Sequence, residues 1–484
     1  MVKKMYKVII GLEVHCELKT ESKNFSSAKN TFSKNPNENV SPIDLGFPGT
    51  LPFVNEEAVY KSLKTAMALN CTIPDVVMFD RKNYFYPDLP KGYQITQMKK
   101  PMGKNGYLDI IVNDVVKRVD IHQLHLEEDT ASLEHFNNFS LLDYNRSGIP
   151  LMEIVTEPCL YSADEAVTFL ESLRSVFLYC EVSDADSRMG QMRCDVNISL
   201  MKDTDTKLGT KVEMKNINAF NTVRNSIEYE IKRQTEILES GGEVIQETRR
   251  YSDEDSKTYA MRDKADAVDY KYFVEPNIPP VKLESDFINK IRREIPMLQF
   301  ERFNKYINEY ELSNYDATIL VKEKEVSDYY NEVISYGIDA KVAANWVITV
   351  ILGSLNKLNV AINDFNITPF MLSEVLKMVV DSEISTNNAK TILYQAMDEN
   401  RDPVAIIKEK NIKQIDEEEI LLPKVKEAID ENNDVFLQYL EGKDYVANFF
   451  IGKVMAKTNK QANPNVTLKI VKEELERRKL NVKK

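Results

Sequence analysis

Hydrophobic and polar residues alternate near the start of the chain. In residues 6–18, YKVIIGLEVHCEL, positions 6, 8, 10, 12 and 14 are apolar, while Glu13, His15 and Glu17 fall on the opposite face. Alternation with a period of two predicts a β-strand that has one face against a core. The other face of this strand therefore carries carboxylate and imidazole groups.

Strand and helix patterns are interleaved over the first 290 residues. A helix is expected after Ser162, because Glu165 completes a capping-box pattern and an apolar stripe follows. A second helix is expected before Gly241, which is suited to the left-handed conformation at a helix end. Further strands are expected at residues 108–112, 115–126, 193–200 and 211–215. This mixture predicts one large α+β domain.

The pattern becomes mainly helical after the proline-rich segment EPNIPP at residues 275–280. Within the helical part, residues 346–351 have the spacing of a buried helix face, and we expect the lone Trp346 in a core. A second break, Asp402 followed by Pro403, precedes the C-terminal segment. The two breaks predict three domains, at residues 1–290, 291–405 and 406–484.

Composition bears on the compartment. Of the 484 residues 43% are hydrophobic, but no apolar run reaches the roughly 18 residues of a membrane span, and no run of signal-peptide length follows the N-terminal lysines. The five cysteines are scattered and include no C-x-x-C pair, which is typical of a reducing compartment. We therefore expect a cytoplasmic protein without a membrane span.

Charge is distributed unevenly along the chain. The formal net charge is -13, yet residues 451–484 contain ten Lys and Arg against three acids. Lys453, Lys457 and Lys460 are candidate contacts for the phosphates of a nucleic acid. The alternative is a solvated basic helix end.

Histidines and acids suggest a metal site. Three of the four histidines flank Glu127, Glu128 and Asp129, and Glu13 and His15 share one strand face. A carboxylate and an imidazole on that face, with a second carboxylate from residues 127–129, can hold one cation. Carboxylate ligands favour Mg²⁺ over zinc, and such Mg²⁺ most often acts on phosphate. The alternative is a polar sheet face that is only solvated.

Residues 80–97, DRKNYFYPDLPKGYQITQ, mix Arg81, Lys82 and Lys91 with four aromatic residues. This mixture suits a loop that binds an anionic ligand able to stack on aromatic rings. The alternative is a tyrosine-rich surface loop packed on the core. Neither common phosphate-binding glycine loop is present in the sequence.

Several longer motifs occur in an order that resembles one family. They are GLEVH (11–15), DRKNYFYPDLPKGYQ (80–94), HLEED (125–129), RSGIPLMEIVTEP (146–158), RCDVNIS (193–199), KNINAF (215–220), QETRR (246–250), DYKYFVEP (269–276) and GKVMAK (452–457). Together they resemble the GatB family, the B subunits of glutamyl-tRNA(Gln)/aspartyl-tRNA(Asn) amidotransferases. The similarity spans essentially the whole chain.

The resemblance implies a fold and an activity. The fold is a glutamine-synthetase-like cradle domain, a helical domain and a small helical YqeY-like tail that contacts tRNA. The activity is that of a ligase that forms a carbon–nitrogen bond with glutamine as amido donor. ATP and Mg²⁺ serve to phosphorylate the side-chain carboxylate of Glu-tRNA(Gln) and/or Asp-tRNA(Asn), and ammonia then displaces the phosphate. The implied partners are misacylated tRNA and, in a heterotrimer, the amidase (the A subunit) plus a small C subunit.

The resemblance also implies roles for particular residues. By motif position, the catalytic and metal-binding residues fall on Glu13, His15, Glu128 and Glu153, and Lys82 is a phosphate contact. Other residues lie in matching motifs without a separate role: Arg193, Asp195, Lys215 and Asn216.

Two segments depart from the family pattern. Many members carry a four-cysteine zinc site in an early loop, but the corresponding positions here are Ser26, Ala28, Ser41 and Asp44, so no structural zinc is expected. Residues 186–192 read DSRMGQM where the family commonly has acidic residues before the glycine, which indicates a weakened second metal site.

Two other functions share part of these features. A stand-alone amide ligase acting on a small carboxylic acid would use the same ATP and Mg²⁺ chemistry without a basic tail. A non-catalytic tRNA-binding scaffold would use the tail without the chemistry.

Overall fold

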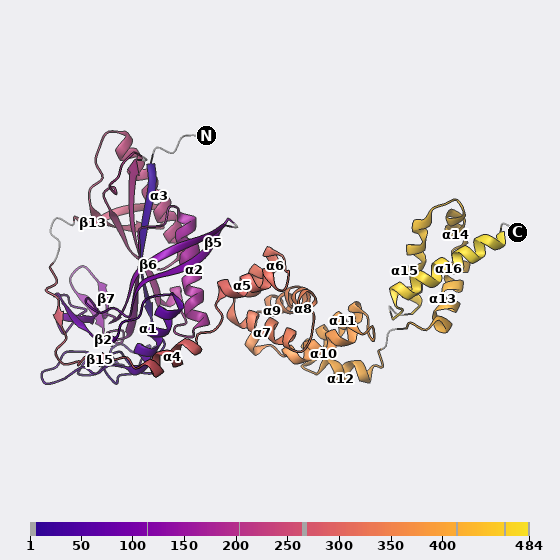
Figure 1. Ribbon diagram of the computed structural model, residues 1–484, viewed down its shortest axis with the longest axis horizontal. Coiled ribbons are helices and arrows are strands. Elements are labelled where there is room, and N and C mark those ends of the chain that lie inside the picture. The colour runs from indigo at the N-terminus through magenta and orange to yellow at the C-terminus, as the bar shows by residue number, and fades with distance from the viewer. Residues whose placement is uncertain are drawn as a thin grey trace. The chain divides into compact units, whose positions relative to one another are not determined.

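The computed structural model describes residues 6–113, 115–202, 204–263, 269–412, 415–458 and 461–482 (Figure 1). The chain forms two compact units, Met1–Arg302 and Phe303–Lys484. The first is built on β-sheets with covering helices, and the described part of the second consists mainly of helices. The expected mixed α+β class is confirmed at this level.

An eight-stranded sheet forms the centre of the first unit. Its neighbouring strands are antiparallel except β11 and β12, which are parallel. Such a sheet can bury one face and leave the other for function. In spatial order the strands are β13 (Lys257–Asp263), β12 (Glu247–Ser252), β11 (Val212–Ile217), β10 (Met192–Lys202), β1 (Tyr6–Glu17), β9 (Pro150–Thr156), β6 (Val115–Glu128) and β5 (Gly103–Val112).

Strand β1 has the two faces that its sequence predicts. Successive side chains of a strand point to opposite sides of the sheet. The apolar side chains of one face are buried in the large hydrophobic cluster of the first unit: Val8, Ile10, Leu12 and Val14. Glu13 and His15 consequently lie on the other face.

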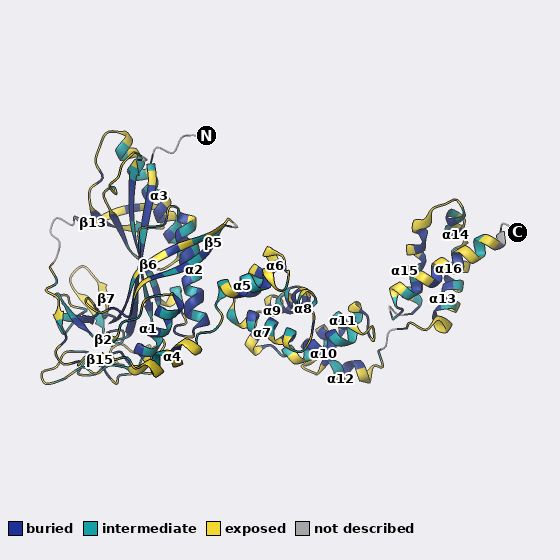
Figure 2. Cartoon of the chain, viewed as in Figure 1, coloured by how far each residue is buried: buried dark blue, intermediate teal, exposed yellow. Residues whose placement is uncertain are grey.

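Several helices contribute to this hydrophobic cluster, among them α1 (Glu56–Ala68), α2 (Ala163–Tyr179) and α3 (Phe220–Glu239). Helix α1 contacts β5 and β6, α2 contacts β5, and α3 contacts β10 and β11. Figure 2 shows the buried segments of these helices in dark blue. Helix α2 begins as predicted, because the Ser162 side chain accepts a hydrogen bond of 3.1 Å from the backbone N–H of Glu165. Gly241 follows α3 with a φ of 81°, in the left-handed conformation expected at that position.

Three small sheets extend the first unit. One contains β14 (Phe273–Val274), β3 (Asp80–Asn83) and β4 (Tyr93–Thr96), so the segment expected as a loop at residues 80–97 begins and ends in paired strands. The others pair β15 (Val281–Lys282) with β2 (Val76–Val77), and β7 (Ser132–His135) with β8 (Ser140–Asp143). Helix α4 (Ser285–Arg293) follows, and its Ile291 is buried in the same core.

The second unit is built from helices. Among the residues that the structure describes, no helix is long and apolar enough to cross a membrane. After α5 (Gln299–Asn308), the helices are α6 (Asn314–Val321), α7 (Lys324–Ser335), α8 (Ala340–Trp346), α9 (Gly353–Leu358), α10 (Pro369–Val380), α11 (Thr386–Glu399), α12 (Pro403–Glu409), α13 (Glu418–Glu431), α14 (Asn433–Leu440), α15 (Ala447–Lys457) and α16 (Pro464–Val482).

The second unit contains two separate hydrophobic clusters. The first extends from Tyr306 to Ile407 and includes the buried Trp346, as predicted. The residues that follow Trp346, Val347–Leu352, form a π-helix where an ordinary α-helical face was expected. The second cluster extends from Leu421 to Leu475. The domain limits expected at residues 290 and 405 stay predictions.

Candidate active site

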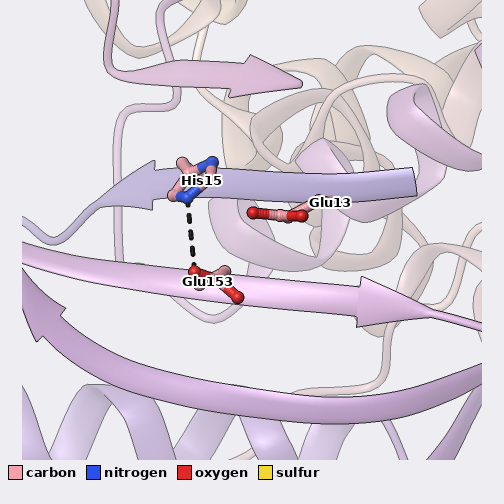
Figure 3. Close-up of side chains that lie close together, drawn as sticks. All are labelled: Glu13, His15 and Glu153. Atoms are coloured by element: carbon pink, nitrogen blue, oxygen red, sulfur yellow. Dashed lines mark ion pairs between the residues drawn. The ribbon is translucent and has the colours of Figure 1, made fainter. Parts of the chain in front are cut away.

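Three side chains come together on the sheet face opposite the hydrophobic core. They are Glu13 and His15 of β1 and Glu153 of β9 (Figure 3). His15 and Glu153 are direct cross-strand partners, with 3.5 Å between His15 Nε2 and Glu153 Oε2. One potential ligand atom from each residue lies within 4.8 Å of the others, and no other set of His, Cys, Asp and Glu in the described chain has this spacing. The structure thus assembles three of the predicted metal residues.

Strand β6 adds two residues to this group. His125 is the cross-strand partner of Glu153, with 3.7 Å between His125 Nδ1 and Glu153 Oε1. Oε1 of Glu127 lies 4.0 Å from His15 Nε2. Glu127 belongs to the acidic run at residues 127–129 from which a second carboxylate ligand was expected, although the family motif pointed to Glu128. His125 was not among the predicted ligands, and its spacing of two from Glu127, which places both on the same strand face, was the signal for it.

Four of these five side chains, all but His15, border a pocket of about 200 Å³. Its lining includes Glu13, Lys82, His125, Glu127, Glu153 and Tyr272. Lys82 belongs to β3 of the small sheet, whereas the acids belong to the large sheet. The predicted phosphate contact and two of the predicted metal ligands therefore face one cavity.

Burial and mutual repulsion control the protonation of the group. Burial, together with the charge of Glu153, raises the pKa of Glu13 above its usual value and that of Glu127 to about 7. Burial opposes the charged form of His15, but its interaction with Glu153 outweighs burial and raises the pKa of His15 to about 9. Burial thus disfavours the charged forms of Glu13 and Glu127, and an additional cation at the site would favour them.

The residues fit a hard divalent cation. Two carboxylates and one imidazole within 4.8 Å of one another provide oxygen ligands and, once the cation displaces the proton of His15, a nitrogen ligand on one side of a site. Mg²⁺ is commonly held by one or two carboxylates and completes its shell with water and substrate phosphate. The donor set is therefore consistent with Mg²⁺ at a site that acts on phosphate.

Glu128 is not part of this group. Its carboxylate forms an ion pair with Lys91 and accepts a hydrogen bond of 2.9 Å from the backbone N–H of Ile95. Glu128 follows Glu127 on β6, so the two side chains leave the strand on opposite faces. The role of Glu128 as a metal ligand stays a prediction, and its carboxylate would have to leave Lys91 to fulfil it.

The ammonium group of Lys82 faces aromatic rings. Its Nζ lies 5.0 Å from the ring centroid of Tyr270 and 5.9 Å from that of Tyr84. Within the described residues it has neither an ion pair nor a hydrogen bond. Burial opposes its charge, but Glu127 and its other neighbours raise the pKa of Lys82 above its usual value. Lys82 is therefore a charged group available to a ligand.

Two further cations next to the group are already paired. Arg193, the cross-strand partner of His15, contacts Asp129 Oδ1 at 2.7 Å. Lys215 lies 3.1 Å from Asp195 and 3.3 Å from Glu213. These contacts provide a structural reason for three motif residues without an assigned role. The side chain of Asn216 lies outside the described part of the structure.

The early loop is held by an ion pair. Lys23 and Asp44 are both buried, and their Nζ and Oδ2 atoms lie 3.1 Å apart. Asp44 also accepts a hydrogen bond of 2.9 Å from the backbone N–H of Ser41. Gly148, with a φ of 87°, packs close to both side chains, and a Cβ there would approach Asp44 to 3.0 Å. The absence of a structural zinc stays a prediction.

The predicted tRNA-binding lysines have different surroundings. Lys453 is exposed, and its Nζ lies 5.2 Å from the ring centroid of Phe449. Lys457 contacts Glu427 at 3.0 Å and Glu431 at 2.8 Å. Lys460 lies outside the described residues.

Comparisons with known proteins agree over almost the whole chain. Residues 8–289 match the family model of the GatB/GatE catalytic domain, and residues 328–475 match that of the GatB domain. The chain is 44% identical to the B subunit of aspartyl/glutamyl-tRNA(Asn/Gln) amidotransferase from Oceanobacillus iheyensis, over 98% of this chain and 100% of that protein. It is 42% identical to the protein of the same name from Persephonella marina, over 97% of this chain and 99% of that protein. The group of Glu13, His15 and Glu153 lies within the first matched segment.

Proposed function

The chain belongs to the family of B subunits of aspartyl/glutamyl-tRNA(Asn/Gln) amidotransferases, and from this we propose that it activates the side-chain carboxylate of Glu-tRNA(Gln), of Asp-tRNA(Asn), or of both. One observation carries the proposal: Glu13, His15 and Glu153 lie together, and Glu13 and Glu153 line a pocket that Lys82 also lines. Such a pocket combines a candidate metal site with a cation able to contact phosphate.

The proposed chemistry has two steps. A carboxylate oxygen of the misacylated residue attacks the γ-phosphorus of ATP, so that an acyl phosphate forms and ADP leaves. Ammonia then attacks the acyl carbon, loses a proton to a base or solvent, and releases inorganic phosphate, which leaves the amide. A carboxylate is a poor electrophile, and phosphorylation gives it a leaving group.

The side chains of the pocket have separate roles in this proposal. Glu13, His15 and Glu153 would hold Mg²⁺, which when bound supplies positive charge to the phosphate oxygens. Glu127 lies next to His15 and lines the same pocket, so we include it among the acids of the site. The Lys82 ammonium would donate hydrogen bonds to the transferred phosphoryl group.

We propose that ammonia comes from a separate amidase in the same complex, and that a small third protein completes the enzyme. Glutaminase chemistry with cysteine requires a reactive thiolate. Burial raises the pKa of Cys16, Cys71 and Cys180 to about 12, and burial also raises that of Cys159 and Cys194. These thiols are therefore poor nucleophiles, and a separate amidase is the simpler source.

We propose the finer domain description as well. The large sheet and its polar face would form the glutamine-synthetase-like cradle at residues 1–290. The two hydrophobic clusters of the second unit would be the cores of a helical domain at 291–405 and of a YqeY-like tail at 406–484 that contacts tRNA. The cytoplasmic location stays a prediction.

The test uses the complex purified from its host with its partner proteins. ATP cleavage is measured with Glu-tRNA(Gln), with Asp-tRNA(Asn) and without tRNA. We expect cleavage that depends on misacylated tRNA, and a loss on the order of 100-fold for His15→Ala and for Glu153→Gln. Glu157→Gln is the matched control, because this glutamate of the segment after β9 is about half exposed and pairs with His122 outside the pocket.

The rival functions give different results. A stand-alone ligase would amidate a small acid without tRNA, and a scaffold would bind tRNA without ATP cleavage. Full activity of His15→Ala at ordinary Mg²⁺ would remove the assignment of the metal site.

A further inference from the structure

Lys82 is near acids and yet forms no ion pair within the described residues. It lines the pocket together with Glu13, Glu127 and Glu153. A flexible lysine beside three carboxylates is expected to turn toward one of them. Its contacts within the described chain are instead the ring faces of Tyr270 and Tyr84.

The two rings form one aromatic group. The centroids of Tyr84 and Tyr270 lie 5.9 Å apart, and those of Tyr270 and Tyr272 lie 6.1 Å apart, both in edge-to-face geometry. Tyr272 in turn lines the pocket. The group therefore continues from the lysine to the pocket wall.

The segment that carries Tyr270 is attached to the strand that carries Lys82. The backbone N–H of Asn83 donates a hydrogen bond of 2.9 Å to the carbonyl of Tyr270, and the Asn83 side chain donates one of 2.7 Å to the carbonyl of Lys271. On the other side of Lys82, Phe273 is the cross-strand partner of Arg81. The main chain is thus fixed on both sides of the lysine, independently of the Tyr270 ring.

The conformation of this segment includes an unusual residue. Lys271, between Tyr270 and Tyr272, has a φ of 47°, in the left-handed region that side chains other than glycine rarely adopt. Such conformations persist where the surrounding structure holds them, and they are frequent at functional sites.

Aromatic faces hold a cation differently from a carboxylate. A ring attracts an ammonium through its quadrupole, without neutralising the charge and without accepting a strong hydrogen bond. The three N–H groups of lysine then stay available to an anion. A carboxylate partner would have to be displaced before a phosphate could bind.

We propose that Tyr270 and Tyr84 are positioning residues that hold the Lys82 ammonium at the pocket, charged and with its donors directed to an incoming phosphoryl group. The inference rests on the proposed function and extends it to two residues that do not need to touch the substrate. The aromatic ring of each tyrosine positions the ammonium, and the hydroxyl group is not needed for this.

The experiment compares variants of Lys82 and Tyr270 in the assembled complex. Lys82→Met should lower kcat/KM for ATP on the order of 100-fold. Tyr270→Leu and Tyr84→Leu should lower it about tenfold, mainly through kcat, because the ammonium is then mispositioned in the transition state. Tyr270→Phe should retain nearly full activity, because it keeps the ring.

A double variant separates positioning from general damage. Lys82→Met with Tyr270→Leu should be no worse than Lys82→Met alone, because the ring acts only through the lysine. Tyr107→Leu is the matched control, since the Tyr107 ring lies 3.6 Å from the Arg118 guanidinium carbon in a similar contact on β5. Assembly and the partner's glutaminase activity report on folding of each variant.

The possible outcomes distinguish failure of this inference from failure of the proposed function on which it rests. A wild-type complex without tRNA-dependent ATP cleavage removes the proposed function and the inference with it. If the wild type is active, any of three results overturns the inference and leaves the proposed function intact. The first is a Tyr270→Leu variant with wild-type kcat, and the second is a Tyr270→Phe variant as poor as Tyr270→Leu. The third is a double variant in which the two losses add.

Discussion

The candidate active site and the C-terminal tail both contain many charged residues, but these charges have different partners. In the site, Lys82 has no ion pair within the described residues, and Glu13, Glu127 and Glu153 share one pocket. In the tail, Lys457 is shared by Glu427 and Glu431, and Arg478 contacts Asp430 and Glu474. A ligand can therefore contact the Lys82 ammonium directly, whereas it must displace a carboxylate neighbour to contact Lys457 or Arg478. The number of charged residues in a segment is therefore a poor measure of the charge that a ligand meets.

The largest expected effect concerns two neighbouring acids of β6. Glu127 lines the pocket, while the Glu128 carboxylate is engaged by Lys91. We expect Glu127→Gln to lower ATP cleavage on the order of 100-fold, because it removes a charge beside the candidate metal ligands. Glu128→Gln should act mainly on stability, because it removes the partner of Lys91.

Steady-state ATP cleavage and thermal unfolding of the same two variants measure this difference. If Glu128→Gln loses activity while Glu127→Gln retains it, the prediction from motif position is right and Lys91 must release Glu128 when the metal binds.

The second prediction extends the comparison to a buried pair. Lys23 is fully buried against Asp44, whereas the Lys457 side chain is 21% exposed. Breaking a buried ion pair leaves one uncompensated charge, so Lys23→Met should lower the free energy of unfolding by about 3–5 kcal/mol. Lys457→Met should change it little, because solvent screens its pairs.

Denaturant unfolding of the full chain, followed by far-UV circular dichroism, gives both values. The double variant Lys23→Met with Asp44→Leu should recover part of the loss, since no buried charge is left alone. A Lys23→Met variant as stable as Lys457→Met would show that the pair does not hold the early loop.

The third prediction tests the C-terminal tail as a whole against the candidate active site. A chain that ends before residue 411 lacks the hydrophobic cluster of the tail but retains all residues of the pocket. We expect it to bind tRNA about tenfold more weakly or worse, with ATP binding little changed, because the phosphate contacts are lost and the pocket is kept. Filter binding with tRNA and calorimetry with ATP, both on assembled complexes, measure the two effects, and an equal loss of both would contradict the separation.

The sequence predicts those parts of the fold and site that depend on local pattern. The alternation in β1 predicts both its buried face and the shared face of Glu13 and His15, and Ser162 with Glu165 predicts the start of α2. These features depend on residues a few positions apart. Recognition of long ordered motifs added Glu153 and Lys82, which the structure brings to the same pocket.

The remaining features depend on contacts between distant segments. The pairing of β6 with β9 shifts register between Ile121 and Gln123, and a shift of one residue decides which of two neighbouring acids lies on the pocket face of the sheet. The contact of Tyr270 with Lys82 joins residues far apart in the sequence, and the pairs of Lys457 form only when α13 and α15 pack. No local pattern in the sequence specifies these contacts.

The smallest expected effect separates two lysines of the tail. Lys453 is exposed and has no ion pair within the described residues, whereas Lys457 has two carboxylate neighbours. If tRNA phosphates contact the tail, Lys453→Ala should reduce the salt dependence of binding by about one phosphate contact, because one counterion fewer is released. Lys457→Ala should reduce it less, because a phosphate must compete with Glu427 and Glu431 for the ammonium.

tRNA affinity measured over a salt series for wild type and both variants gives the slopes. An equal reduction of the salt dependence by the two variants would show that the ion pairs of Lys457 do not weaken its contact with the RNA. Unchanged slopes in both variants would show that the basic end of the tail is a solvated surface that does not contact tRNA phosphates.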